Sequence, residues 1–208
     1  MSRLDGVALG SRPLTSDQVA GLASALTTLH TAVPSAVVQE LPRRLWCAAD
    51  AVDSLRVRVS EPPGELAPRV RGAFELGAEW INSDEATRFA GEETTLVFAQ
   101  ADGNLANAIW DGARCGLVDF EDSGASDRAF EVADLVEHMS AWLTGVLDAS
   151  DLLRQLELDQ ALSHRIHLGR RVMALFWLLN LMPGNPGHER NPEGSLDRQA
   201  GRLLGLLR

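Results

Sequence analysis

The chain has 208 residues, of which 45% are hydrophobic and 23% are charged, a composition typical of a soluble globular protein with one ample core or two small domains. All 19 basic residues are arginines, and 29 acidic residues bring the formal net charge to −10. This balance argues against a binder of nucleic acid or anionic membranes, which needs a basic face, and the lack of lysine excludes chemistry that depends on a lysine.

The first half of the chain is predicted to be largely helical. Residues 1–13 show no sustained period and read as a loop or a short strand. Thr15 and Gln18 have the spacing of a capping box, and an apolar stripe follows them, so a helix is predicted from Thr15 to Pro34.

Less regular helical patterns follow this helix. Residues 35–59 are predicted to be helical with a break at Pro42, and residues 65–81 form a further helix. The side chains expected to be buried in this second segment are Phe74, Leu76 and Trp80. Residues 82–93 are predicted to be a polar loop.

Short β-type segments occupy the middle of the chain. Residues 94–99 are predicted to form a strand. Two further apolar segments, 108–110 and 115–118, flank Asp111-Gly112, which is a strong hairpin signal. Residues 121–126 are predicted to be a loop.

Helical patterns return in the last third of the chain. A stripe with a 3.6-residue period predicts one continuous helix that ends near residue 146; its members are Val132, Val136, Met139, Leu143 and Val146. Further helices are predicted over 149–158, 159–182 and 194–208, with 183–192 as a loop. The predicted fold class is therefore mainly α with a small antiparallel β element (α+β).

Polar residues around the hairpin have the types that phosphoryl transfer to a hydroxyl requires. Asn107 lies five residues after Asp102, and Asp119 closes the second hairpin segment. One carboxylate can orient the hydroxyl and take its proton, while an amide oxygen and a second carboxylate can hold Mg²⁺. The alternative is that Asp102 and Asn104 are only turn residues, which both types favour.

Three stretches, 101–107, 117–124 and 126–135, resemble the aminoglycoside phosphotransferase family of kinase-like enzymes, and Leu29-His30 resembles the end of a helix in that family. The family signature is His-Gly-Asp with an Asn five residues after the Asp, then Ile-Asp-Phe, then Gly-Asp and Asp-Leu. Here Gln100-Ala101 replaces His-Gly.

The resemblance implies a role for each matching residue. Asp102 would be the catalytic base, and Asn107 and Asp119 would be Mg²⁺ ligands, with ATP or GTP as phosphate donor. Structural support of the site is expected from Gln100, Asp127 and Asp134.

The resemblance also implies an organisation of the chain. Residues 1–13 would be a hinge remnant, and residues 14–208 a kinase-like C-terminal lobe. Within that lobe the catalytic and metal loops would span 100–122, and a helical substrate subdomain would comprise 35–82 and 127–208.

The family's nucleotide-binding N-terminal lobe has no counterpart in this sequence, which contains no G-x-G-x-x-G motif. Either the gene product extends upstream of Met1, or the chain is a natural C-terminal lobe from which we do not expect normal ATP turnover. The face without an N-terminal lobe would expose apolar surface that a second copy, in a homodimer, could cover.

Two functions stay open. One is an ATP-dependent phosphotransferase that acts on a hydroxyl of a small molecule; the other is a non-catalytic remnant that serves as a small-molecule or protein-interaction module. The acidic charge fits a cationic substrate, although it also aids solubility. We expect a cytoplasmic protein that contacts neither nucleic acid nor membrane, since no leader or long apolar run is present.

One face of the predicted helix after residue 126 is strongly polar. Asp127, Glu131, Asp134 and His138 share it by their spacing. The favoured interpretation is a solvated stripe, and the alternative is an acidic wall that faces a cationic substrate.

Overall fold

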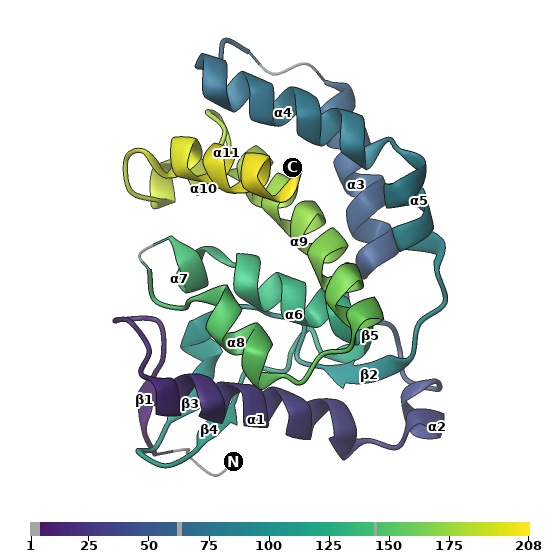
Figure 1. Ribbon diagram of the computed structural model, residues 1–208, viewed down its shortest axis with the longest axis vertical. Helices are drawn as coiled ribbons and strands as arrows, with labels where there is room; N and C mark the ends of the chain where they lie inside the picture. The colour runs from purple at the N-terminus through teal and green to yellow at the C-terminus, as the bar shows by residue number, and fades with distance from the viewer. Residues whose placement is uncertain (1–4, 62–63, 144) are drawn as a thin grey trace. The chain divides into compact units, whose positions relative to one another are not determined.

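The computed structural model describes residues 5–61, 64–143 and 145–208, and the chain divides into two compact units (Figure 1). The first unit comprises the chain up to Cys47 together with Thr94–Ile166, and the second comprises Ala48–Glu93 and His167–Arg208. Among the residues that are described, no helix is both long enough and apolar enough to cross a membrane.

The first unit combines small sheets with helices. Its elements are β1 (Val7–Ala8), α1 (Ser16–Ala32), α2 (Ser35–Val38), β2 (Leu96–Ala99), η1 (Leu105–Asn107), β3 (Ala108–Trp110), β4 (Cys115–Leu117), β5 (Gly124–Asp127), α6 (Arg128–Glu137), α7 (Met139–Trp142) and α8 (Ala149–Gln155). Helix α9 (Gln160–Asn180) begins in this unit and continues into the second.

Two antiparallel sheets form the strand part of the first unit. One has the order β1-β3-β4, and the other pairs β2 with β5 so that Leu96 lies opposite Asp127 and Ala99 opposite Gly124. The predicted hairpin is confirmed, since β3 and β4 pair around Asp111-Gly112.

The segment just before the second unit runs along the free edge of β5. Arg43 forms a parallel bridge with Ala125, and the Ala125 N–H donates to the Pro42 carbonyl at 2.8 Å. Gly124 permits this approach, because a Cβ there would lie 2.7 Å from the backbone of both Pro42 and Arg44. This pairing brings Arg44 to the inner side of the unit.

Helix α1 supplies one wall of the first unit's core. The predicted capping box is confirmed: Thr15 Oγ1 accepts from the Gln18 N–H at 3.3 Å, and Gln18 Oε1 accepts from the Thr15 N–H at 3.0 Å. Helix α1 packs mainly against α8, β2 and β4. Its stripe belongs to the hydrophobic core of the unit, and the buried members are Val19, Leu22, Ala23 and Leu26.

The second unit is helical over its described residues. Its elements, besides the end of α9, are α3 (Ala48–Ser60), α4 (Pro68–Ile81), α5 (Asp84–Gly91), α10 (Pro186–Arg190) and α11 (Ser195–Leu206). Gly77 allows α4 to pack closely, since a Cβ there would lie 2.8 Å from Leu175 Cδ1. Trp80 Nε1 and the Arg171 guanidinium both donate to Glu85 at 2.6 Å, which ties α4, α5 and α9 together.

Several sequence-based predictions for these helices are wrong. Residues 82–93 contain α5, whose N-terminus Ser83 caps and whose Phe89 is buried, and the predicted loop 183–192 contains α10. Leu76, predicted to be buried, is 48% exposed.

Two further predictions fail around residue 130. The predicted loop 121–126 contains most of strand β5. The predicted continuous helix is divided into α6 and α7, because His138 has extended torsions and its ring accepts from the Ser140 N–H as a cap.

Candidate active site

The site is built on the loop that connects β2 to η1. Ala101 has a φ of +70°, in the left-handed region, and Asp102 follows it. Asp102 Oδ1 accepts from the Asn104 N–H at 2.9 Å, which makes the loop turn on itself, and Asn104 Oδ1 caps η1 by accepting from the Ala106 N–H at 3.1 Å. Asn104 is therefore a turn residue, and Asp102 is a turn residue as well as a candidate site residue.

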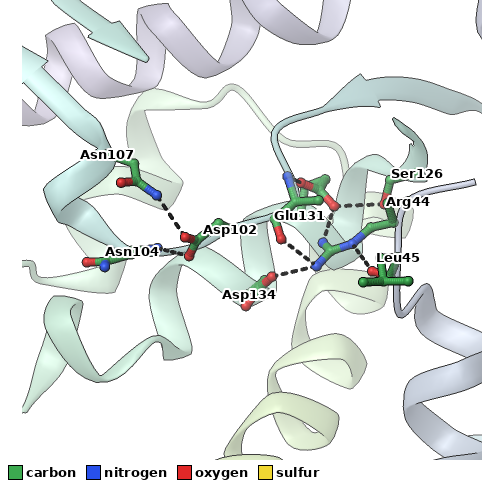
Figure 2. A network of polar contacts seen from close by, with 9 residues as sticks. Arg44, Leu45, Asp102, Asn104, Asn107, Ser126, Glu131 and Asp134 are labelled. Atoms are coloured by element: carbon green, nitrogen blue, oxygen red, sulfur yellow. Dashed lines mark hydrogen bonds and ion pairs between the residues drawn. The ribbon is translucent and has the colours of Figure 1, made fainter. Parts of the chain in front are cut away.

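Asp102 and Asn107 lie in direct contact, as Figure 2 shows. Asn107 Nδ2 donates to Asp102 Oδ2 at 2.8 Å. Only the amino group of an asparagine amide can donate, so the amide oxygen of Asn107 points away from Asp102. The contact fixes which end of the amide is left for a ligand.

The hairpin joins the segment that carries Asp119 to Asn107 through the backbone. The Val118 N–H donates to the Asn107 carbonyl at 2.9 Å, and Asp119 is the next residue. Gln100 Nε2 donates to the Val118 carbonyl and ties the loop before Asp102 to the same point. Asp119 is exposed, has a φ of +64°, and has no side-chain hydrogen bond or ion pair within the described part of the chain.

A buried cluster of charges lies behind the loop, and we call Arg44, Ser126, Glu131 and Asp134 the Arg44 cluster (Figure 2). Arg44 is only 4% exposed. Its guanidinium donates to Glu131 Oε1 and, at 2.9 Å, to Asp134 Oδ2. Ser126 Oγ donates to the same Glu131 Oε1 at 2.8 Å, so this oxygen has two partners.

The Arg44 cluster also binds the backbone of the loop. Arg44 donates to the Ala101 carbonyl at 3.0 Å, and Glu131 Oε2 accepts from the Ala101 N–H at 3.2 Å. Gly103 packs directly on α6, where a Cβ would lie 2.7 Å from the Asp134 carbonyl. Residues from α6 and from the edge of β5 thus hold the loop before and after Asp102.

The cluster holds two carboxylates around one guanidinium, and its ionisation reflects this. Burial, assisted by the nearby carboxylates of Glu131 and Asp102, raises the pKa of Asp134 to about 6, although Arg44 opposes the shift. Burial alone would lower the pKa of Arg44, but Glu131 and Asp134 raise it above its ordinary value. Arg44 therefore stays charged, and Asp134 binds a proton at a higher pH than an ordinary aspartate does.

The predicted solvated stripe on the helix after residue 126 is wrong. Asp127, Glu131 and Asp134 are each less than 10% exposed. Asp127 caps α6 by accepting from the Ala129 N–H at 2.8 Å, and its second oxygen accepts from Arg165 Nε at 2.7 Å. These acids face the interior of the unit because arginines from elsewhere in the chain meet them there.

Sequence analysis did not identify Arg44 as a site residue. Its partners lie on β5 and α6, far along the chain, and no local period connects them. Arg44 is the second of two arginines between Pro42 and Leu45-Trp46, and the sequence does not distinguish it from Arg43.

The donor atoms at the hairpin suit a hard divalent cation. The amide oxygen of Asn107 and the carboxylate of Asp119 are oxygen ligands, and Mg²⁺ commonly takes only one or two such ligands from protein. No cluster of three or more His, Cys, Asp or Glu side chains suited to a metal occurs in the regions that the structure describes. A cation held mainly by nucleotide phosphates would fit these residues, whereas a cation in an all-protein cage would not.

Comparison with known proteins identifies the family. The family model described as "Phosphotransferase enzyme family" matches residues 1–176. A search of curated proteins found no significant match.

Solved structures show the same fold at low sequence identity. A choline/ethanolamine kinase family protein from Mesorhizobium loti is 19% identical, with a TM-score of 0.68 over 100% of this chain and 69% of that one. The choline kinase LicA from Streptococcus pneumoniae is 15% identical, with a TM-score of 0.58 over 97% and 66%. An aminoglycoside 2'-phosphotransferase-IIIa is 14% identical, with a TM-score of 0.60 over 99% and 68%.

The chain thus spans about two thirds of the length of these structures. The predicted fold class, mainly α with small antiparallel sheets in a kinase-like phosphotransferase, is confirmed. The resemblance inferred from the residues around Asp102 and Asp119 is likewise confirmed: the chain belongs to the phosphotransferase enzyme family.

Proposed function

We propose that this chain supports the Mg²⁺-dependent transfer of the γ-phosphate of ATP or GTP to a hydroxyl of a small molecule. The observation that carries the proposal is the Asp102–Asn107 pair, 2.8 Å apart, on a loop hydrogen-bonded to the residue before Asp119. Phosphoryl transfer needs little covalent help from protein, so catalysis rests on such positioning and on charge neutralisation.

Asp102 is the proposed base. Each of its oxygens accepts one hydrogen bond from the loop, and a carboxylate oxygen can accept more than one, so Asp102 can still accept from an incoming hydroxyl. The two internal bonds hold the carboxylate in one orientation, which is what an acceptor hydroxyl requires of its base.

Asn107 and Asp119 are the proposed Mg²⁺ ligands. Asn107 would use the amide oxygen that its bond to Asp102 leaves free, and Asp119 would use its exposed carboxylate. When bound, the cation neutralises charge on the transferred phosphate.

The donor and acceptor are proposed by analogy with the solved structures. A spectinomycin phosphotransferase is described in complex with ADP, and the aminoglycoside 2'-phosphotransferase-IIIa in complex with GDP. The others include kinases of choline and ethanolamine, which suggests a small acceptor with a hydroxyl. The net charge of −10 favours a cationic acceptor.

Titration calorimetry of the 208-residue chain with ATP or GTP, with and without Mg²⁺, tests the metal site. We expect binding that requires Mg²⁺ and that Asp119→Ala weakens at least about tenfold, as for loss of a metal ligand. Asp122→Ala is the matched control, because it removes an exposed carboxylate from the same loop.

Asp102→Asn separates binding from chemistry. It should leave nucleotide binding within about twofold of the wild type and lower phosphate transfer to choline or an aminoglycoside by about 10²–10⁴-fold, the usual contribution of a general base. Nucleotide binding that is absent, or that is indifferent to Mg²⁺ and to Asp119→Ala, would overturn the proposal and favour a non-catalytic module.

A further inference from the structure

Ala101, the residue before the proposed base, has a backbone conformation that alanine disfavours. Its φ of +70° lies in the left-handed region, where the β-carbon crowds the backbone. Such a residue persists only where its surroundings fix it. Ala101 is buried, so this fixation comes from protein groups rather than from solvent.

The Arg44 cluster holds both peptide groups of Ala101. Glu131 Oε2 accepts from the Ala101 N–H, which belongs to the peptide before the Cα. Arg44 donates to the Ala101 carbonyl, which belongs to the peptide after it. Because φ and ψ are the rotations between these two peptides, the two hydrogen bonds together restrain both torsions of Ala101.

The Ala101 torsions set the direction in which Asp102 leaves the loop. The peptide whose carbonyl Arg44 holds ends at the Asp102 Cα, and Gly103 rests on the backbone of Asp134. Asp102 is thus held from both sides of its Cα, and its carboxylate meets Asn107 (Figure 2).

We propose that Arg44 is a positioning residue for Asp102: by holding the Ala101 carbonyl, it keeps the Asp102 carboxylate in register with Asn107. This inference rests on the proposed function. It adds to the site a residue, Arg44, that lies outside the sequence motif of Asp102, Asn107 and Asp119. Arg44 contacts none of the three proposed site residues, and it acts through the backbone.

The neighbouring arginine provides a matched control. Arg43 is exposed, and its side chain has no hydrogen bond or ion pair to any described residue. Arg44→Lys keeps the buried charge but replaces the planar fork with one ammonium group, which cannot reproduce the geometry of the bonds to Glu131, Asp134 and Ala101. Arg43→Lys makes the same chemical change at the surface.

Two measurements on these variants test the proposal. In transfer assays, Arg44→Lys should lower kcat by about 10- to 100-fold and change the KM for nucleotide by less than about twofold, as for a misplaced base. In NMR spectra of labelled protein without nucleotide, it should shift the Asn107 side-chain amide signals and speed their exchange. Arg43→Lys should change neither measurement.

The outcomes separate this inference from the proposed function. If the wild-type chain transfers no phosphate, the proposed function fails, and the Asn107 signals still report whether Arg44 holds the Asp102–Asn107 pair. Unchanged Asn107 signals in folded Arg44→Lys, or a kcat equal to that of Arg43→Lys, would overturn the inference. If Arg44→Lys does not fold, a triple variant without charges in the cluster replaces it: Arg44→Met, Glu131→Gln and Asp134→Asn. The expected shift and faster exchange of the Asn107 side-chain amide signals are the same.

Discussion

Arg44 and His30 are both buried in the first unit, at 4% and 7% exposure, but their surroundings are opposite. The Arg44 guanidinium has two carboxylates and two backbone carbonyls as partners. Neither ring nitrogen of His30 has a hydrogen-bond partner among the described residues, and the charged group that acts on its ionisation is a cation, Arg128.

The difference shows what a buried basic group needs: a group that stays charged is accompanied by carboxylates, and a group without such partners is neutral. Burial, with a smaller contribution from Arg128, lowers the pKa of His30 to about 4, so His30 is neutral at physiological pH. Arg44 is as deeply buried, but a guanidinium keeps its proton at any physiological pH, and Glu131 and Asp134 compensate the cost of burying that charge and raise its pKa further.

Removal of the partnered charge should have the largest effect on stability. Arg44→Met leaves Glu131 and Asp134 buried without a cation, and we expect a loss of about 3–5 kcal/mol in the free energy of unfolding, measured by urea denaturation. Arg43→Met should change that free energy by less than about 0.5 kcal/mol. A loss below about 1 kcal/mol for Arg44→Met would show that the two carboxylates find water or protons instead.

Acidification should remove the contribution that neutral His30 makes to stability. The pKa of His30 is about 4 in the folded chain and near 6.5 when unfolded, so the unfolded chain takes up the proton first as the pH falls. Stability from neutral His30 is complete above pH 6.5 and is lost between pH 6.5 and 4.

His30→Leu isolates this effect from other titrations. Asp134, whose pKa is raised to about 6, acts in the opposite direction, since the folded chain binds its proton first; this contribution is common to both proteins. The stability of His30→Leu relative to the wild type should therefore rise by about 2 kcal/mol between pH 7.5 and pH 5. An equal difference at both pH values would mean that the His30 ring has a partner that holds its proton.

An exposed ion pair should have the smallest effect on stability. Arg69 NH1 and Asp197 Oδ2 are 2.9 Å apart in the second unit, and both side chains are 55% exposed. A double-mutant cycle with Arg69→Gln and Asp197→Asn should give a coupling energy of about 0–1 kcal/mol that falls with added salt. A coupling energy as large as the loss of stability expected for Arg44→Met would contradict the view that an ion pair contributes more when it is buried.

Local signals were enough to predict part of the fold. The capping box at Thr15 and the Asp111-Gly112 turn act over a few residues, and both are present as predicted. The site motif is similarly local, because Asn107 reaches Asp102 across one turn of 3-10 helix.

Tertiary contacts account for the elements that the sequence did not reveal. Strand β5 exists because β2 and the Pro42–Arg44 segment pair with its two edges, and neither adjoins it in the chain. Helix α5 has a clear cap at Ser83 and acidic residues in its first turn, but it is short and mostly polar, with only Ala86 and Phe89 buried, so the segment resembles a polar loop. The acids on α6 looked solvated because their arginine partners are distant in sequence.

Gly124 shows how a position with no functional group can govern one. Any side chain there would push Pro42 and Arg44 off the edge of β5, because a β-carbon already meets their backbone at 2.7 Å. The guanidinium would then be withdrawn from Ala101. A Gly124→Ala substitution that abolished activity would therefore act on the position of Asp102, through the displaced edge of β5.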